Sequence, residues 1–269
     1  MKGKLNETSL DRLCGALCYA MGIDAPEKAA EPSEELVAYV NEQMGAEKVD
    51  RIFMYNPDAV AEWIYEKYPQ LFKEADAAVG VKIPFRTVMP SVTPVCFGTM
   101  YTGAQPAVHG IQRYERPVIK IDTIFDAMIR AGKKPVIIAI GDCSLAKIYL
   151  EREMDYFIYD TYEEVNAKAA EVIMEDKYDM VVVYNGNYDA TMHKKGPESL
   201  DSLSELRMNV RTFGMFNQLI QNRWKEHSTL VGFAMDHGCH EIDEGCGSHG
   251  LDMEEDLNIV HMYKIHKKA

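Results

Sequence analysis

The chain lacks the sequence features of membrane, exported and metal-ribbon proteins. No apolar run in the 269 residues is long enough to cross a bilayer, and the first residues, MKGKLNETSLDRL, contain no signal-peptide core. None of the six cysteines forms a CxxC pair, which argues against a zinc ribbon or a dithiol redox motif. Because no export signal accompanies them, these cysteines are typical of reduced thiols, and we expect a cytoplasmic protein.

Basic residues are scarce relative to acidic ones. The chain has 29 Lys and Arg against 42 Asp and Glu, which gives a formal net charge of −13. This balance argues against a nucleic-acid polymer or an anionic membrane as the main partner. A small phosphorylated substrate is still compatible with it, because bound divalent cations would reverse the local charge. The hydrophobic content of 47% is ordinary for a globular protein of this size.

The first part of the chain has a helical pattern. Residues 8–22 and 33–44 each place apolar side chains on one helix face, and a polar stretch that begins and ends with proline joins them. We predict that residues 1–46 form a helical appendage packed on a main domain of residues 47–269.

From residue 49 onward, apolar strand-like runs alternate with helical patterns, without internal repeats. We expect strands over 49–55, 134–140, 156–159, 180–184, 229–234 and 257–265. We expect helices over 59–67, 93–103, 121–131, 144–153, 161–176 and 199–226. Strands that are apolar throughout and separated by helices predict a mostly parallel sheet covered on both faces. The expected fold class is therefore α/β, a three-layer α/β/α sandwich.

A short helix is predicted to start at Thr93. Thr93 is a good N-cap, Pro94 suits the first turn, and Gly103 can end the helix. The N-terminus of a helix favours an anion such as phosphate. Taken alone, a Thr-Pro pair is most often an ordinary cap.

Carboxylates and imidazoles collect directly after predicted strands, where ligands of parallel sheets bind. Asp189 and His193 are four residues apart, so one helical turn places them on the same face. Singly, such a pair is most often a surface ion pair, and a DHG sequence is commonly a turn. The residues that would meet at this edge are Asp58, Asp189, Asp236, His193, His237 and His249. Three carboxylates gathered there would repel one another unless cations lay between them, and mixed Asp and His ligands suit zinc or manganese.

The ordered motifs resemble those of a known family. "PSVTP…TG…P…HGI", "YDATMH", "MDHG" and "GSHG" are similar to motifs of the alkaline phosphatase superfamily, and most of all to its nucleotide pyrophosphatase/phosphodiesterase-like branch. With Asp58, they extend over most of the chain. The resemblance implies that Thr93 is the nucleophile and forms a phosphothreonine intermediate, which water then hydrolyses.

The resemblance also implies two divalent metal ions, zinc or alternatively manganese. One ion would be held by Asp189, His193 and His249, and the other by Asp58, Thr93, Asp236 and His237. The implied function is a two-metal phosphoric-ester hydrolase, either a phosphodiesterase of the nucleotide pyrophosphatase type or a phosphatase, that acts on a small phosphorylated substrate.

Two positions depart from the family pattern. The first metal aspartate of the family normally lies in an Asp-Gly pair directly after the strand, whereas this chain reads Asn56-Pro57-Asp58-Ala59. Asp58 is our assignment, and Asn56 is the alternative. The phosphodiesterase branch usually places a phosphoryl-binding asparagine three residues after the nucleophile. Cys96 occupies this substrate-binding position and is a poor donor, so the backbone N–H groups of Val95 and Cys96 are further candidates.

Other functions on the same fold stay open. A phosphonate hydrolase is one alternative, and a phosphosugar mutase is another, although mutases usually carry a sizeable inserted domain that this chain lacks. The sulfatase signature Cys-x-Pro-x-Arg is missing. The two irregular positions also fit a catalytically decayed metal- or ligand-binding relative. Because only a short loop separates His237 from His249, we expect specificity to come from residues 106–189, from the N-terminal helices, or from a second subunit of a homo-oligomer.

The remaining histidines receive no ligand role. We interpret His109 as a structural residue after the Thr93 helix and His240 as a loop residue. His261 and His266 fall in or after the last predicted strand and have no obvious partner.

Overall fold

The computed structural model describes residues 4–269 and contains one large sheet. Its eight strands are, in spatial order, β1 (Thr8–Ser9), β3 (Val81–Arg86), β10 (Asn258–His266), β7 (Thr229–Phe233), β2 (Arg51–Pro57), β6 (Met180–Asn185), β4 (Pro135–Ile140) and β5 (Asp155–Tyr159). All neighbouring strands are parallel, except that β10 runs antiparallel to both β3 and β7. A separate hairpin consists of β8 (His240–Ile242) and β9 (Cys246–Ser248).

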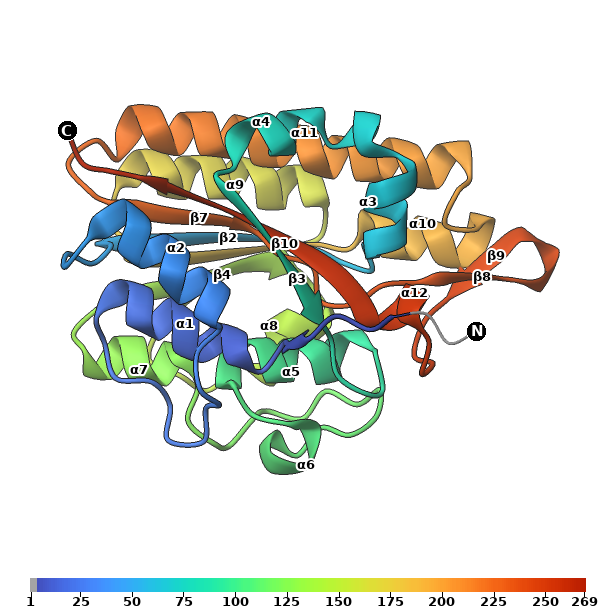
Figure 1. Cartoon of the computed structure of the whole chain (residues 1–269), viewed down its shortest axis with the longest axis horizontal. Coiled ribbons are helices and arrows are strands. Elements are labelled where there is room, and N and C mark those ends of the chain that lie inside the picture. Colours follow the sequence, from blue (N-terminus) through green and yellow to red (C-terminus); the bar gives the residue numbers. More distant parts are fainter. Residues whose placement is uncertain (1–3) are drawn as a thin grey trace.

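Helices cover both faces of the sheet. On one face lie α3 (Glu62–Lys67), α4 (Lys73–Ala78), α9 (Tyr162–Glu175), α10 (Asn187–Lys195) and α11 (Leu200–Arg223), and on the other lie α1 (Arg12–Met21), α2 (Glu34–Met44), α5 (Thr93–Thr102), α7 (Ile124–Arg130) and α8 (Ser144–Ile148) (Figure 1). The short helices are η1 (Pro69–Leu71), α6 (Pro106–His109), η2 (Asp243–Gly245) and α12 (Glu254–Leu257). This arrangement confirms the predicted three-layer α/β/α fold with a mostly parallel sheet.

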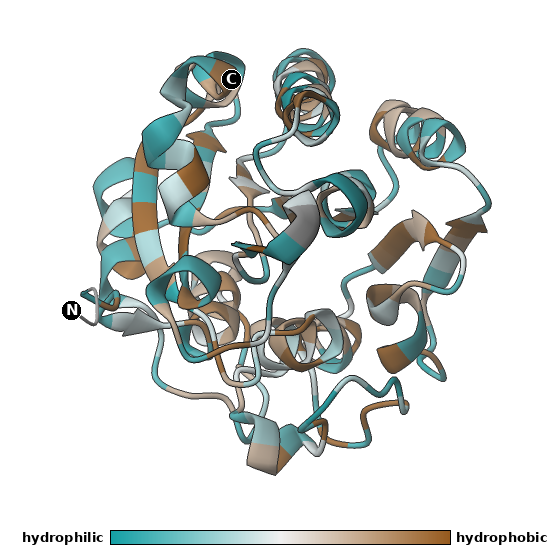
Figure 2. Cartoon of the chain, turned by 90° about the vertical axis from the view of Figure 1, so that its right-hand side faces the viewer, coloured by the Kyte–Doolittle hydropathy of each residue, from teal (hydrophilic) through white to brown (hydrophobic). Residues whose placement is uncertain are grey.

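The core lies where the central strands meet the inner helices. Strands β2, β6 and β7 are buried along their whole length, as expected for parallel strands covered on both sides. All ten residues of α5 are buried as well, because α1, α6, α7 and α8 enclose this helix against the sheet. The outer helices carry mixed hydrophilic and hydrophobic positions, as amphipathic helices do (Figure 2).

Two edge features differ from the sequence prediction. Residues 8–11, expected to start the first helix, form β1 and a turn, and α1 begins at Arg12. Strand β3 was not predicted, because its alternating burial and internal Pro84 do not read as a buried strand. The division into an appendage of residues 1–46 and a domain of residues 47–269 stays a prediction.

Several helix boundaries also differ from the predicted ones. Helix α8 ends at Ile148 instead of residue 153, and α3 begins at Glu62 instead of residue 59. None of the helices in the described part of the chain is both long and apolar enough to span a membrane. All six cysteines lie among the described residues, and each has a free thiol.

Candidate metal centre

Three adjacent strands bring the predicted residues to one edge of the sheet. Strands β7, β2 and β6 are neighbours and run parallel, so their carboxyl ends lie side by side. Asp58 directly follows β2, and the loop after β7 contains Asp236 and His237. Helix α10 begins after β6 and carries Asp189 and His193 on adjacent turns. Thus local chain geometry places five of the predicted residues at this edge.

The β8–β9 hairpin brings the sixth residue back to the same place. His240 pairs with Ser248 in the hairpin, so the chain comes back close to His237 at the end of β9. His249 directly follows Ser248, and its ring stacks on the ring of His237 with a centroid distance of 4.1 Å.

One group of ligand-type side chains, which we call the buried group, consists of Asp58, Asp236 and His237. His237 Nε2 lies 3.3 Å from Asp58 Oδ1 and 3.3 Å from Asp236 Oδ2. All three side chains are at most 1% exposed. The hydroxyl of Thr93 joins them, with its Oγ1 at 3.4 Å from Asp58 Oδ2 and 3.3 Å from His237 Nε2.

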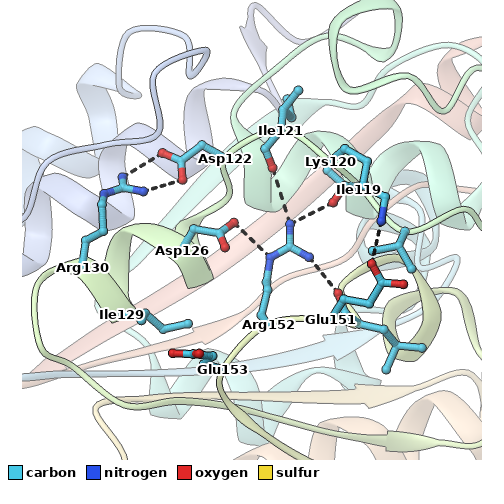
Figure 3. A pocket seen from close by; sticks show the side chains of 12 residues that line it. Ile119, Lys120, Ile121, Asp122, Asp126, Ile129, Arg130, Glu151, Arg152 and Glu153 are labelled. Carbon is cyan, nitrogen blue, oxygen red and sulfur yellow. Dashed lines mark hydrogen bonds and ion pairs between the residues drawn. The ribbon is translucent and has the colours of Figure 1, made fainter.

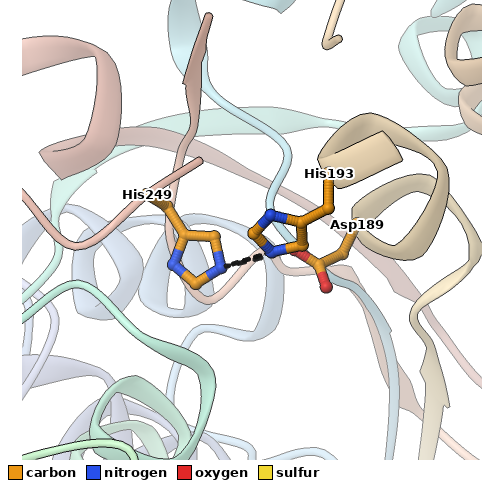
Figure 4. A group of neighbouring side chains, drawn as sticks. All are labelled: Asp189, His193 and His249. Carbon is orange, nitrogen blue, oxygen red and sulfur yellow. Dashed lines mark hydrogen bonds and ion pairs between the residues drawn. The ribbon is translucent and has the colours of Figure 1, made fainter. Parts of the chain in front are cut away.

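The second group, which we call the open group, consists of Asp189, His193 and His249 (Figure 4). Asp189 Oδ1 lies 3.3 Å from His193 Nε2 and 3.5 Å from His249 Nε2. The two imidazole Nε2 atoms are 3.1 Å apart. This group reaches the surface, because the His193 side chain is 41% exposed.

The three histidines present the same ring nitrogen to the carboxylates. In each ring, Nδ1 lies 2.9 or 3.0 Å from a backbone carbonyl oxygen, that of Gly238 for His237, of Gly247 for His193 and of Ser91 for His249. A carbonyl oxygen only accepts, so Nδ1 must donate, and in the neutral ring Nε2 then carries a lone pair. In metal sites, hydrogen bonds from the other ring nitrogen to a carbonyl oxygen fix the orientation of histidine ligands in this way.

The carboxylates present matching unpaired atoms. Among the described residues, Asp58 Oδ1, Asp189 Oδ1 and Asp236 Oδ2 are buried and have no hydrogen-bond donor. These are the same oxygens that lie 3.3 to 3.5 Å from the imidazole Nε2 atoms. Acceptors that face one another in a buried site repel, and a divalent cation between them removes this repulsion. These oxygen and nitrogen atoms are therefore suited to act as ligands of two metal ions, one in each group.

The titration behaviour of the buried group follows from the same crowding. Burial raises the pKa of Asp58 to about 7, and the negative charge of Asp189 adds to the rise. Burial also raises the pKa of Asp236 well above its ordinary value, with a further contribution from Asp58. Burial lowers the pKa of the His237 imidazole well below its ordinary value. The protein without a cation thus disfavours charge on all three side chains.

The open group behaves in the opposite way. Burial raises the pKa of the Asp189 carboxyl, but hydrogen bonds from His193 and His249, which their Nε2 atoms donate only when protonated, outweigh burial and lower this pKa. The hydrogen bond to Asp189 raises the pKa of His193. Burial lowers the pKa of His249, yet the same carboxylate reverses the shift and leaves that pKa raised. Protons therefore compete with metal ions for the imidazoles of this group.

Thr93 does not cap its helix as the sequence suggested. It is the first helical residue of α5, the N-cap is Val92, and no side chain caps this end. Its hydroxyl turns toward Asp58 and His237 instead. The prediction that Gly103 ends the helix was correct, since Gly103 has φ 71° and its N–H donates to Thr99 O.

The Cys96 thiol is packed against Thr87, and the N–H groups of Val95 and Cys96 already have acceptors. The Cys96 side chain is fully buried, its Sγ lies 3.1 Å from Thr87 Oγ1, and burial raises its pKa well above the ordinary value. The N–H groups of Val95 and Cys96 both donate to Val92 O at 3.0 Å, so their candidate role in holding a phosphoryl group stays a prediction without structural support. The substrate-binding role given to Cys96 stays a prediction, without a supporting contact.

Asn56 lies outside the cluster of ligand-type side chains. Its Nδ2 donates to Ala234 O at 2.7 Å, and its Oδ1 accepts from Tyr101 OH at 2.7 Å, so the side chain ties β2 to α5 and to the end of β7. Between Asn56 and Asp58 as the first ligand position, the structure places Asp58 in the cluster.

Sequence reasoning missed Tyr184, the residue that fixes Asp58. Its hydroxyl donates to Asp58 Oδ2 at 2.5 Å, and burial raises the pKa of this phenol. No sequence signal indicates this contact, because Tyr184 reads as an ordinary apolar residue near the end of β6. The alanine after Asp58 was noted as a departure, and Ala59 indeed has φ 62°, a left-handed conformation that favours glycine.

The other histidines are satisfied by local partners. His109 lies 3.1 Å from Thr99 Oγ1, as expected for a structural residue, and burial lowers its pKa to about 4. The expectation that His261 and His266 lack partners was wrong. His261 contacts Met235 O at 2.6 Å, and His266 contacts Asn217 Oδ1 at 2.7 Å.

A separate cavity of about 530 Å³ lies beside α7 and is distinct from the metal centre (Figure 3). Its central cation, Arg152, is paired with Asp126 at 2.9 Å and donates to the carbonyl groups of Ile119, Ile121 and Leu150. Arg130 in turn pairs with Asp122. Because these guanidinium groups are already bonded within the protein, we assign no ligand to this cavity.

No protein-family model and no curated protein sequence matches the chain. Solved structures do match. Human ectonucleotide pyrophosphatase/phosphodiesterase 5 aligns over 72% of this chain and 58% of its own, with a TM-score of 0.59 and 16% identity. The murine protein, described as an inactive threonine-to-alanine variant in complex with AMP, aligns over 72% and 59% with a TM-score of 0.57 and 17% identity.

A phosphonoacetate hydrolase from Sinorhizobium meliloti in complex with phosphonoformate also matches, over 71% of this chain and 57% of its own, with a TM-score of 0.54 and 16% identity. The chain thus spans 57% to 59% of the length of these proteins. At such low identity the likeness establishes the fold.

Proposed function

We propose that this chain, which has the fold of the alkaline phosphatase superfamily, is a two-metal hydrolase of small phosphoric esters with Thr93 as its nucleophile. The observation that carries the proposal is that hydrogen-bond acceptors without donors face one another in a buried site. Three buried carboxylate oxygens without donors lie 3.3 to 3.5 Å from imidazole Nε2 atoms, and Thr93 Oγ1 lies 3.3 Å from one of these atoms. A cap or a surface ion pair does not need this arrangement.

The residues divide between two ions, with zinc as our first choice and manganese as the alternative. Asp189, His193 and His249 would hold one ion, and Asp58, Asp236, His237 and Thr93 would hold the other. When bound, the two ions lower the pKa of a coordinated hydroxyl and stabilise charge on the attacking and leaving oxygens.

The chain's own residues position the nucleophile. Thr93 is held at the start of the buried helix α5, and its hydroxyl can donate to Asp58 Oδ2 at 3.4 Å. The hydrogen bond from Tyr184 keeps that carboxylate in place. In the first step Thr93 Oγ1 would bond to phosphorus while the ester bond breaks and the alcohol leaves. Water would then cleave the phosphothreonine and restore the hydroxyl.

The similar structures suggest two substrate classes. The murine structure is described with AMP and as an inactive threonine-to-alanine variant, which supports a nucleotide-like phosphodiester and a threonine-dependent reaction here. The bacterial structure is described with phosphonoformate, and this supports a phosphonate hydrolase as the second candidate. The sequence-based alternative of a phosphosugar mutase gains no support. The cytoplasmic location and the possible homo-oligomer stay predictions.

The decisive variant is Thr93→Ala. We expect hydrolysis of bis(nitrophenyl) phosphate to fall by roughly a thousandfold or more, because the nucleophile is lost. Bound metal should stay near two ions per chain, since six ligands remain. The matched control is Thr102→Ala at the opposite end of the same buried helix, where the hydroxyl donates to Gly98 O. Its turnover should stay close to wild type.

Two measurements separate the alternatives. A panel of phosphodiester, phosphomonoester and phosphonoacetate distinguishes ester hydrolysis from phosphonate cleavage. Elemental analysis of the purified protein distinguishes an enzyme from a decayed relative, because two transition ions per chain are expected for catalysis. Unchanged turnover in Thr93→Ala would refute the nucleophile assignment.

A further inference from the structure

The carboxylate of Asp256 joins the segments on either side of the β8–β9 hairpin. Asp256 is completely buried. Its Oδ1 accepts a hydrogen bond from His240 Nδ1 at 2.7 Å, and its Oδ2 accepts one from the backbone N–H of Leu251 at 2.8 Å. His240 begins the outgoing strand of the hairpin, and Leu251 lies two residues after the candidate ligand His249.

The backbone of the same residue holds the other histidine loop. The N–H of Gly238, which follows His237, donates to Asp256 O at 2.9 Å. A Cβ atom at position 238 would lie 2.0 Å from Glu255 O, so the two segments approach as closely as glycine permits. Residues 237–240 and 249–251 are thus fastened to one residue of α12.

We propose that Asp256 is a positioning residue that sets the place of His249 in the open group. The inference rests on the proposed two-metal function. Asp256 touches none of the six ligand-type side chains, and it acts through the backbone that carries His249. Its side chain binds Leu251 on the His249 side and His240 on the His237 side, and its backbone carbonyl binds Gly238. A side-chain substitution removes the first two bonds but keeps the Gly238 bond, so it loosens the His249 side more than the His237 side.

The buried carboxylate is an unusual choice for a purely structural link. A carboxylate without solvent is costly unless its oxygens are hydrogen-bonded, and here each oxygen has one donor. The His249 ring contacts Ser91 O at 2.9 Å and stacks on the ring of His237, while the position of its backbone depends on the segment that Asp256 binds at Leu251. Loss of the Leu251 bond therefore loosens the segment that carries His249. In known metal sites, removing a residue that orients a ligand without touching the metal lowers the affinity for the metal.

The test is the metal-binding isotherm of the metal-free full chain, titrated with Zn²⁺ and followed by calorimetry. In Asp256→Ala we expect the binding step of the open group, identified as the step that His193→Ala also weakens, to weaken about tenfold or more, and the other step to change less than threefold. Asp256→Asn should keep most of the wild-type affinity. The amide oxygen can accept from the Leu251 N–H, and the amide NH₂ can donate to His240 Nδ1 in the tautomer in which that nitrogen accepts. His240→Ala should weaken the same step by a smaller factor.

The matched control is Asp126→Ala, which removes a capping and Arg-paired carboxylate from α7, away from the metal centre. We expect this variant to lose thermal stability while both binding steps stay unchanged. If Asp256→Ala folds poorly, His240→Ala carries the test, with Asp256→Asn as the variant expected to bind nearly as wild type does.

Four outcomes are informative. Equal weakening of both steps, or no weakening of either in Asp256→Ala, would overturn the positioning role and leave the two-metal function intact. A wild-type protein that binds no Zn²⁺ would refute the proposed function itself. Selective weakening of the open-group step in Asp256→Ala, with near wild-type binding in Asp256→Asn, is the result that supports the inference. Selective weakening of the buried-group step would overturn it.

Discussion

The buried group and the open group contain the same residue types but differ in how the protein encloses them. Asp58, Asp236 and His237 are at most 1% exposed, whereas His193 is 41% exposed. In the buried group, desolvation raises the carboxyl pKa values and lowers that of the imidazole. In the open group, mutual hydrogen bonds favour the charged forms. Without a cation, the first group is strained by its burial and the second forms internal ion pairs.

This difference suggests different tasks for the two groups. A site enclosed by Thr93 and the ends of β2 and β7 would exchange its ion slowly and hold the nucleophile. A site on α10 that reaches solvent would exchange its ion readily and meet the incoming substrate. We expect the two binding steps to differ in affinity and in pH dependence for this reason.

Asp236→Asn should show the largest contrast between the groups. Zn²⁺ binding at the buried group should weaken at least a hundredfold, because a ligand itself is changed and not only a residue that orients a ligand. The open group should keep most of its affinity. The metal-free variant should nevertheless be more stable than wild type at neutral pH by about 1 kcal/mol. Its uncharged amide avoids the penalty of a buried carboxyl whose pKa is raised, and its Oδ1 can still accept from Ala59 N.

Denaturant unfolding of the metal-free proteins and calorimetric titration of the folded ones measure both effects. The stabilised variant should lose its advantage at low pH, where the carboxyl is protonated in the folded and the unfolded states of wild type. A less stable metal-free Asp236→Asn, or unchanged metal binding, would contradict our view of the buried group.

The histidines of the two groups should titrate on opposite sides of the ordinary imidazole pKa of about 6.5. In the metal-free protein His193 and His249 are expected to titrate above this value, because Asp189 favours their charged forms, and His237 below it, because it is buried. Ring resonances followed by NMR check each site. Since bound metal must displace the protons, affinity at the open group should fall up to tenfold for each proton displaced and each unit of pH below neutrality.

Ala59→Gly should have the smallest effect and tests the strain beside the buried group. The left-handed φ of 62° costs an alanine about 1–2 kcal/mol, and glycine removes this cost but loses a buried methyl group and backbone entropy in the folded state. The free energy of unfolding should therefore change by less than about 1 kcal/mol. Ala59→Val should cost about 2 kcal/mol or more and weaken only the buried group. Equal stability of the valine and alanine proteins would show that the turn is unstrained.

The sequence predicts this fold well where strands are buried on both faces. The runs at 134–140, 180–184 and 229–234 agree with β4, β6 and β7 to within one residue at each end. Apolar runs carry no information on direction, so the antiparallel orientation of β10 could not be anticipated. The alternating burial and the proline of β3 hid that strand, and β1 is too short to produce a pattern.

The candidate site was predictable where a ligand directly follows a strand, as Asp58 does, or lies in the loop just after one, as Asp236 does. The resemblance supplied the grouping of these residues with Thr93. The contacts that fix the site were invisible in the sequence. Tyr184 lies within an apolar strand and Asp256 within an acidic run, and only the folded chain brings them to Asp58 and Leu251.

The middle of the sheet depends on a segment near the end of the chain. Strand β10, residues 258–266, inserts between β3 and β7, which precede it in the sequence by very different distances. During synthesis the backbone N–H and C=O groups of β3 and β7 that pair with β10 stay unpaired until β10 has been made. A chain truncated before residue 258 would leave β1 and β3 detached from the remaining strands, and we expect it to aggregate rather than to fold as a smaller domain.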